Sequence, residues 1–100
     1  MNMSNGEKPR YIVRFRTARV QREIDSLTER EGERVRLAIN ELSLDPRPRG
    51  CSKLDDNTFR IRVGVWRVIY IIHDRDRIVD IAAVRRRSES TYRDIRKFSD

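Results

Sequence analysis

The stretch from residue 59 to residue 70 constrains the fold more than any other part of the chain. It reads Phe-Arg-Ile-Arg-Val-Gly-Val-Trp-Arg-Val-Ile-Tyr, so two alternating segments flank Gly64 and Val65. Glycine followed by any residue is a favoured two-residue hairpin loop of type II′, because glycine supplies the positive φ that the first loop position needs. Counting outward from the loop predicts the cross-strand pairs Val63–Trp66, Arg62–Arg67, Ile61–Val68, Arg60–Ile69 and Phe59–Tyr70.

Side chains alternate across a strand, so this hairpin has two faces of opposite character. The apolar face carries Phe59, Ile61, Val63, Trp66, Val68 and Tyr70. The other face carries Arg60, Arg62 and Arg67. Opposed like charges destabilise a strand pair by roughly 0.2–1 kcal/mol, whereas a phosphate between the two guanidinium groups replaces repulsion with charge-assisted hydrogen bonds. The alternative interpretation is that the arginines extend into solvent or pair with carboxylates elsewhere.

Composition narrows the classes of partner. The chain has 100 residues with 39% charged side chains and a net charge of +7, which fits one small domain and an acidic partner such as nucleic acid, an anionic membrane or an acidic protein. The longest apolar run, residues 68–72, is too short to span a membrane, and a single cysteine, Cys51, fits a reducing cytoplasm. We expect a disordered leader over residues 1–9 and a single domain over residues 10–100.

Periodicity predicts the remaining elements. Residues 11–16 alternate as a strand, with Tyr11, Val13 and Phe15 on one face. A first helix is expected near residues 18–28 after the N-cap Thr17, and its apolar stripe is Val20, Ile24 and Leu27. The second helix, with the stripe Val35, Ala38, Ile39 and Leu42, starts either near residue 29, where Thr28 and Glu31 have capping-box spacing, or after Gly32. The prolines at positions 46 and 48 stop it.

A third strand of the same sheet is predicted over residues 78–84. A four-residue loop over residues 74–77 pairs Ile72 with Val79, Tyr70 with Ile81 and Val68 with Ala83, and it places Val84 opposite Arg67. A short terminal helix over residues 88–98 then carries Tyr92. The order β-α-α-β-β-β gives an α+β fold, an antiparallel sheet with a helical hairpin on one face. The basic run 85–87 begins at the same end of the sheet as the hairpin arginines, so the two basic clusters converge on one concavity.

Several segments form a pattern that extends from residue 11 to about residue 95. They are residues 11–15, residues 45–50, Lys53-Leu54, the hairpin stretch 59–70, and a terminal basic run followed by Tyr92-Arg93. This pattern resembles the RelE/ParE superfamily of toxins from toxin–antitoxin pairs. The motif Arg-Ile-Arg-Val-Gly-x-x-Arg-Val-Ile-Tyr, with Lys-Leu just upstream, is typical of the RelE-like branch.

The resemblance implies a ribosome-dependent endoribonuclease that cuts mRNA in the ribosomal A site by attack of the messenger's own 2′-OH. It implies catalytic roles for Arg60, Arg62, Arg67, Tyr92 and a terminal arginine, which is Arg86 or Arg87. Arg49, Lys53 and Arg85 are expected to bind RNA or the ribosome. The implied partners are a RelB-like antitoxin, the ribosome and mRNA, with a hetero-oligomer of toxin and antitoxin and no membrane. No cofactor is implied.

The sequence also departs from the family pattern. The best-known RelE pattern has two lysines where this chain has Arg60 and Arg62, and arginine is not deprotonated in proteins. Proton transfer therefore falls to Tyr92, a ribosomal RNA group or water. Residues 88–91, Ser-Glu-Ser-Thr, replace the usual basic approach to the tyrosine. The alternatives are a ParE-like inhibitor of DNA gyrase with the same fold, and a non-catalytic nucleic-acid-binding or decayed toxin.

The remaining candidates have ordinary structural interpretations. His73, the single histidine, is expected to be a turn residue, Tyr70 a core residue, and Cys51 a loop residue. Trp66 is expected to pack in the core, although a base could also stack on it. No group of residues has metal-ligand spacing.

Overall fold

The computed structural model describes residues 10–86. Its elements are β1 (Ile12–Phe15), α1 (Ala18–Asp25), α2 (Glu29–Glu41), β2 (Ser52–Lys53), β3 (Thr58–Val63), β4 (Trp66–His73) and β5 (Ile78–Arg86). The predicted terminal helix, and Tyr92 with it, lies outside the described residues. None of the helices between residues 10 and 86 is long and apolar enough to cross a lipid bilayer.

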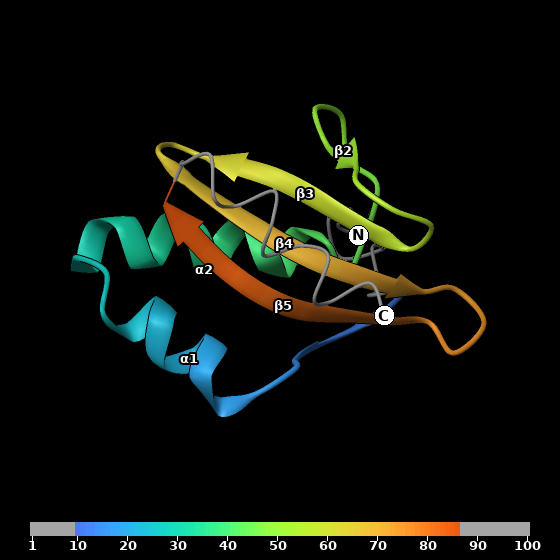
Figure 1. The fold of residues 1–100 in the computed structure, drawn as a ribbon, viewed down its shortest axis with the longest axis horizontal. Coiled ribbons are helices and arrows are strands. Elements are labelled where there is room, and N and C mark those ends of the chain that lie inside the picture. The colour runs from blue at the N-terminus through green and yellow to red at the C-terminus, as the bar shows by residue number, and fades with distance from the viewer. Residues whose placement is uncertain (1–9, 87–100) are drawn as a thin grey trace, which may run out of the picture.

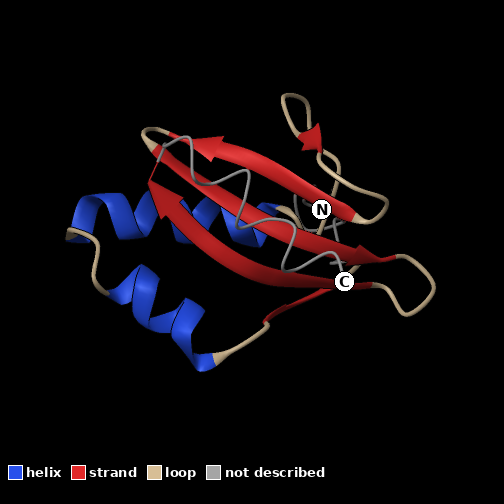
Figure 2. Cartoon of the chain, viewed as in Figure 1, coloured by secondary structure: helices blue, strands red, loops and turns tan. Residues whose placement is uncertain are grey.

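The strands form one sheet in the order β1-β5-β4-β3-β2. All neighbouring strands are antiparallel except β1, which runs parallel to β5. The helical hairpin covers one face: α2 crosses behind β3 and β4, while α1 lies along β5 (Figures 1 and 2). The predicted α+β class is confirmed, and the parallel first strand and the short β2 add to it.

The β3–β4 hairpin has the predicted register throughout. All five expected cross-strand pairs are present, from Val63–Trp66 to Phe59–Tyr70. Gly64 has a φ of 62°, while Val65 is not among the residues with positive φ, which is the type II′ pattern. The apolar face packs against the helices, and its buried members are Phe59, Ile61, Val63, Val68 and Tyr70.

The predicted β4–β5 register is right at one end and wrong at the other. Ile72 pairs with Val79 and Tyr70 with Ile81, as expected, but Val68 pairs with Val84 and not with Ala83. The cause is a β-bulge at Ile69/Tyr70, where Ala82 is an extra residue in β5. The expected placement of Val84 opposite Arg67 is therefore also wrong.

The helices begin where capping chemistry places them. The Thr28 side chain accepts a hydrogen bond of 3.2 Å from the Glu31 backbone N–H, so α2 starts at Glu29 and includes Gly32. Thr17 occupies the N-cap position of α1 with an extended backbone and without a side-chain cap bond. The buried stripes of the two helices are Val20, Ile24, Val35, Ile39 and Leu42.

The sheet face away from the helices has a small apolar centre of its own. Ile69, Ile71, Ala82 and Ala83 are buried there, with Leu54 beside them.

Phe15, which we expected to share a face with Tyr11 and Val13, is 37% exposed, while Tyr11 and Val13 pack against the main core.

Candidate functional site

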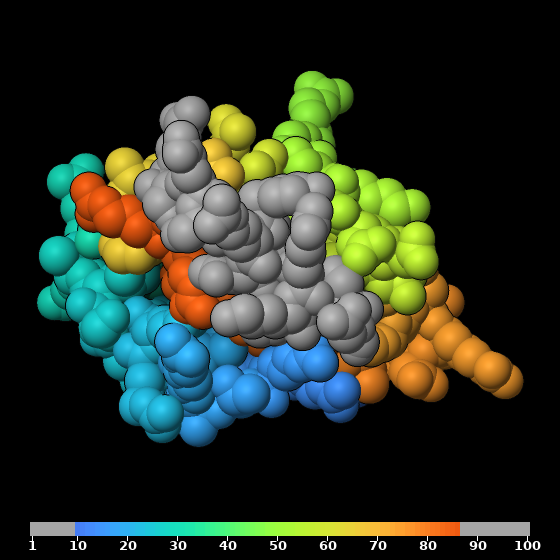
Figure 3. Space-filling model, viewed as in Figure 1, coloured from blue at the N-terminus to red at the C-terminus, as the bar shows by residue number. Residues whose placement is uncertain are grey.

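Three arginines on adjacent strands form one row across the sheet. Arg62 of β3 stands opposite Arg67 of β4, and Arg67 stands opposite Arg85 of β5. Directly opposed residues project from the same face of a sheet, so this arginine row (Arg62, Arg67 and Arg85) lies on the face away from the helices. The bulge at Ala82 creates the row, because it brings Arg85 into the place predicted for Val84. The row lies at the end of the sheet that carries the β3–β4 turn. There the last residues of β5 lie beside this turn and α2 (Figure 3).

Arg60 lies on the same face, two residues before Arg62. Its guanidinium donates a hydrogen bond of 2.8 Å to the Ser52 hydroxyl, and Ser52 is its cross-strand partner in β2. The short strand β2 therefore holds Arg60 beside the row. The predicted grouping of Arg60, Arg62 and Arg67 on one face is confirmed.

Glu23 of α1 fixes the outer end of the row. Its carboxylate accepts a hydrogen bond from the Arg85 guanidinium and another, 3.1 Å long, from the Val84 backbone N–H. Arg19 lies 3.5 Å from the same carboxylate. Glu23 thus joins the helix to the β5 edge beyond the point where β1 ends. Sequence reasoning did not single out Glu23, because its sequence position on a charged helix face carries no signal of a partner more than sixty residues away.

Arg86 is separated from the row. It stands opposite Trp66 in the ladder, and its guanidinium lies over the Trp66 ring at 5.8 Å from the centroid. Arg86 therefore belongs to the face that carries Trp66. Arg87, the other candidate for the terminal arginine, and Tyr92 lie outside the described residues.

The two predicted loop contacts do not join the row either. Lys53 is exposed and stands opposite Phe59, so its register position is on the helix-side face. Arg49 is exposed in the loop between α2 and β2. Both are accessible to a large partner, but neither shares the face of Arg62 and Arg67 through a strand pairing.

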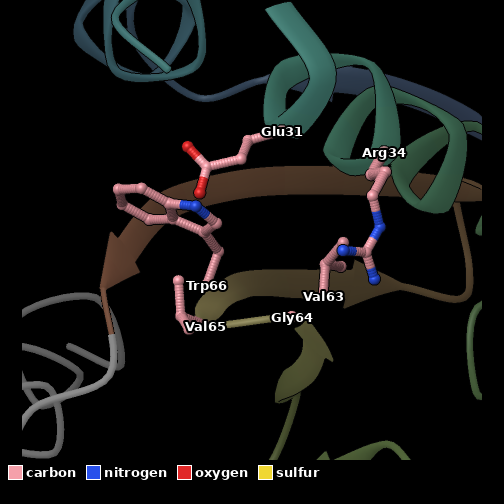
Figure 4. Close-up of a pocket in the computed structure, with 6 residues that line it drawn as sticks. All are labelled: Glu31, Arg34, Val63, Gly64, Val65 and Trp66. Atoms are coloured by element: carbon pink, nitrogen blue, oxygen red, sulfur yellow. The ribbon is translucent and has the colours of Figure 1, made fainter. Parts of the chain in front are cut away.

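A small pocket lies between the N-terminal turn of α2 and the tip of the hairpin. Its volume is about 150 Å³, and it is lined by Glu31, Arg34, Val63, Gly64, Val65 and Trp66 (Figure 4). Trp66 packs partly against the core, as expected, and also forms one wall of this pocket. Its indole nitrogen is buried without a hydrogen-bond partner among residues 10–86.

A polar cluster at the opposite end of the molecule joins three segments. The Arg47 guanidinium binds both oxygens of Asp74, at 3.1 and 2.7 Å, and the Tyr11 hydroxyl donates to Asp74 at 2.7 Å. These hydrogen bonds lower the pKa of Asp74 from 3.8 to about 2, and the hydrogen bonds from Arg47 have the largest effect. The bond to Asp74 likewise raises the pKa of Tyr11. This cluster is structural, because it ties the residue before β1, the loop after α2 and the β4–β5 turn together.

The two other titratable candidates also lie away from the row. His73 ends β4 with its Nε2 atom 3.8 Å from the buried Asp80 carboxylate. It is six residues from Arg67 along one strand, roughly 20 Å at about 3.3 Å per residue. Tyr70 is fully buried, as expected, and its hydroxyl donates to the Pro46 carbonyl at 2.8 Å. Burial raises the pKa of Tyr70.

The chemistry of the row is that of an anion site without a base. Guanidinium groups donate hydrogen bonds in a planar fork that matches phosphate oxygens, and they do not accept protons in proteins. Between residues 10 and 86 no group of histidine, cysteine or carboxylate side chains is arranged to hold a metal ion. The row can therefore bind a phosphate and stabilise added negative charge on it.

Comparison with known proteins agrees with this architecture. Residues 9–91 match the family described as ParE toxin of type II toxin–antitoxin system, parDE. A comparison with curated protein sequences gave no match.

Solved structures with the same fold are RelE toxins. The archaeal RelE of the RelE–RelB complex from Pyrococcus horikoshii has a TM-score of 0.74 and 25% identity, over 80% of this chain and 98% of that chain. The toxin–antitoxin complex RelBE2 from Mycobacterium tuberculosis has a TM-score of 0.65 and 33% identity, over 80% of this chain and 100% of that chain. The isolated RelE toxin of E. coli, at 19% identity over 88% of this chain and 98% of that chain, shares the fold with a TM-score of 0.67. The chain therefore belongs to the RelE/ParE superfamily of toxins from type II toxin–antitoxin systems.

Proposed function

We propose that this toxin is a ribosome-dependent endoribonuclease that cuts mRNA in the ribosomal A site and so inhibits translation. The observation that carries the proposal is the arginine row, which spans three strands on one face. A fold gains no stability from Arg62 standing opposite Arg67, but the arrangement suits a phosphodiester. The similarity to RelE toxins, at 33% identity in one case, supports the same activity.

The proposed reaction is an internal transfer within the mRNA, which supplies both the nucleophile and the leaving group. The 2′-oxygen attacks the adjacent phosphorus, a P–O bond to the 2′-oxygen forms, and the bond to the 5′-oxygen breaks. The products are a 2′,3′-cyclic phosphate and a 5′-OH end, so the proton lost by the 2′-OH is balanced by the one gained by the 5′-oxygen. The transition state carries extra negative charge on the phosphoryl oxygens, which Arg62 and Arg67 stabilise as preorganised donors.

Proton transfer requires a group outside the row, because arginine is not a proton acceptor. We assign this role to Tyr92, to a ribosomal RNA group or to water. His73 is a poor candidate because it lies at the far end of β4. The other proposed roles follow the sequence: Arg60 and the terminal arginine bind the scissile region, and Arg49 and Lys53 contact ribosomal RNA. Of the two candidates for the terminal arginine we propose Arg87, because Arg86 lies over Trp66 on the other face of the sheet. Arg85, expected only to bind RNA, joins the phosphate-binding row.

The proposed partner is a RelB-like antitoxin. The similar solved structures include complexes of a RelE toxin with RelB or a RelB peptide and the toxin–antitoxin complex RelBE2. A net charge of +7 favours an acidic antitoxin, because complementary charge accelerates association. Co-purification of the toxin with the small protein encoded beside it, and rescue of growth by that protein, tests this assignment. Failure of both removes it.

The decisive experiment uses a translation extract with a defined mRNA and the purified toxin, and it maps 5′ ends by primer extension. We expect new ends inside the A-site codon, absent when ribosomes are withheld and absent for Arg67→Ala. Arg75→Ala is the matched control, because Arg75 is an exposed arginine in the β4–β5 turn. Intact mRNA with normal protein synthesis would refute the proposal.

A second candidate function is inhibition of DNA gyrase, as implied by the ParE branch. The specific observation in its favour is the match of residues 9–91 to the ParE toxin family. In this case the toxin inhibits supercoiling by purified gyrase, and neither Arg67→Ala nor Tyr92→Phe changes that inhibition. If neither mRNA cutting nor gyrase inhibition is found, a non-catalytic nucleic-acid-binding or decayed toxin is left. Such binding is salt-sensitive and tolerant of sequence.

A further inference from the structure

Glu23 is an acidic side chain of α1 that contacts the arginine row. The Arg85 guanidinium and the Val84 backbone N–H both bind its carboxylate. Both side chains of the ion pair are largely shielded from water, with 18% of Glu23 and 25% of Arg85 exposed. Shielding strengthens an ion pair relative to the surface pairs that contribute little. Arg85 is therefore already engaged by an anion of the toxin itself.

The two bonds of Glu23 have different consequences. The bond to the Val84 N–H satisfies a backbone donor at the β5 edge, and a neutral amide oxygen can make the same bond. The bond to Arg85 depends on the negative charge, and it occupies a guanidinium whose register position belongs to the row. The first bond is structural, whereas the second competes with any phosphate that approaches Arg85.

We propose that Glu23 is an internal counter-ion that holds Arg85 at α1 until an RNA phosphate displaces it. The inference rests on the proposed function in one respect, namely that RNA is the ligand of the row. In the free toxin Arg85 is paired with Glu23, and it acts together with Arg62 and Arg67 when a phosphate replaces the Glu23 carboxylate. Glu23 is thus a positioning residue that sets the affinity of the site for RNA.

The chain offers a matched control on the same helix. Asp25 is also a carboxylate of α1, but it pairs with Arg36 of α2 at 2.8 Å. Glu23→Gln and Asp25→Asn each remove one negative charge and keep the shape of the side chain. Only Glu23→Gln removes the charge that pairs with Arg85, while the Gln amide oxygen preserves the bond to the Val84 N–H.

The test measures the binding of a fluorescein-labelled single-stranded RNA to the purified toxin by anisotropy, over a range of salt concentrations. We expect Glu23→Gln to bind about fivefold more tightly than Asp25→Asn, with a salt dependence steeper by about 0.7, the value for one more phosphate contact on a single strand. Arg85→Ala in the Glu23→Gln background should abolish the gain. Equal affinities and slopes for Glu23→Gln and Asp25→Asn, or weaker binding by Glu23→Gln, would overturn the proposal.

A second measurement needs no substitution at Glu23. The ¹³C shift of the Glu23 carboxylate in the unmodified toxin should move on addition of the same RNA, as Arg85 leaves it. A shift that stays constant while RNA binds contradicts the displacement. Neither measurement depends on ribosomes or cutting, so the counter-ion can be established even if the extract shows intact mRNA, and it can fail even if cutting is found.

Discussion

Arg62 and Arg67 stand directly opposite each other across the β3–β4 ladder. Like charges in this position repel, by roughly 0.2–1 kcal/mol. This pair of arginines therefore reduces the stability of the hairpin, and a neutral side chain at one of the two positions should restore that stability. We expect Arg62→Gln to raise the free energy of unfolding by about 0.2–1 kcal/mol at low salt and to impair mRNA cutting. Thermal unfolding and the translation extract measure the two effects.

The control for this prediction is Arg75→Gln, which removes the same charge from an exposed turn position. It should change stability by less than about 0.5 kcal/mol and leave cutting intact. Added salt screens surface charges, so the gain from Arg62→Gln should shrink at high salt. Destabilisation by Arg62→Gln would mean that the opposed arginines do not repel.

Tyr70→Phe tests a buried hydrogen bond below the hairpin. The Tyr70 hydroxyl is the donor for the Pro46 carbonyl, at 2.8 Å. Its removal leaves that carbonyl without the bond, so the free energy of unfolding should fall by about 1–2 kcal/mol, as measured by urea denaturation. Tyr11→Phe is the matched control, because its hydroxyl contacts Asp74 at the surface, and it should cost less. Equal losses for the two variants would contradict this interpretation.

Asp74 should make stability depend on pH in the acid range. Its folded-state pKa of about 2 lies below its ordinary value of 3.8. Its contribution is therefore complete above about pH 4 and is lost as the pH falls through about 2. Asp74→Asn should lower the unfolding free energy at neutral pH, by up to about 1 kcal/mol because the pair is partly exposed.

The measurement for Asp74 is urea denaturation of both proteins between neutral pH and pH 2. The difference between the toxin and Asp74→Asn should be constant above pH 4 and should shrink toward zero near pH 2. A difference that persists at pH 2 would indicate that the charge of Asp74 is not the cause.

Gly64→Ala tests the turn that orders the hairpin. The φ of Gly64 is 62°, and a Cβ atom there would lie 3.3 Å from the Arg34 guanidinium. The strained backbone should cost about 1–2 kcal/mol, measured by thermal unfolding. Val65→Ala changes the second residue of the same turn, where the side chain is 46% exposed, and should change stability by less than about 0.5 kcal/mol. A neutral Gly64→Ala would show that the turn can adopt another type.

The sequence predicts the hairpin well because its information is local. Gly64 sets the turn, and strict alternation from Phe59 to Tyr70 then fixes which side chains face the core. The predicted β4–β5 pairing is correct only from the turn to Ile81. Ala82 and Ala83 are both small and apolar, so the alternation of side chains there does not reveal the bulge. The error of one residue changed the partner of Arg67 from Val84 to Arg85.

Contacts between residues far apart in the sequence could not be predicted, because sequence patterns carry only local information. Glu23 looks like any other charge on a solvated helix face, and only the fold brings it to Arg85. The parallel pairing of β1 with β5 is equally non-local. Phe15 fitted the alternation of the first strand, but β1 is an edge strand, and the residue ends up exposed. The assignments of Arg87 and Tyr92 stay predictions.

The position of β5 between β1 and β4 has a consequence for the newly made chain. Synthesis proceeds from the N-terminus, so β1 emerges early but finds its neighbour only when the last strand of the sheet has been made. Pairing across such a long stretch of sequence closes slowly. A nascent chain that has not yet reached Arg85 contains two of the three arginines of the row and an unpaired first strand. The row is therefore completed late, because its third arginine and the partner strand of β1 both belong to the last strand to be made.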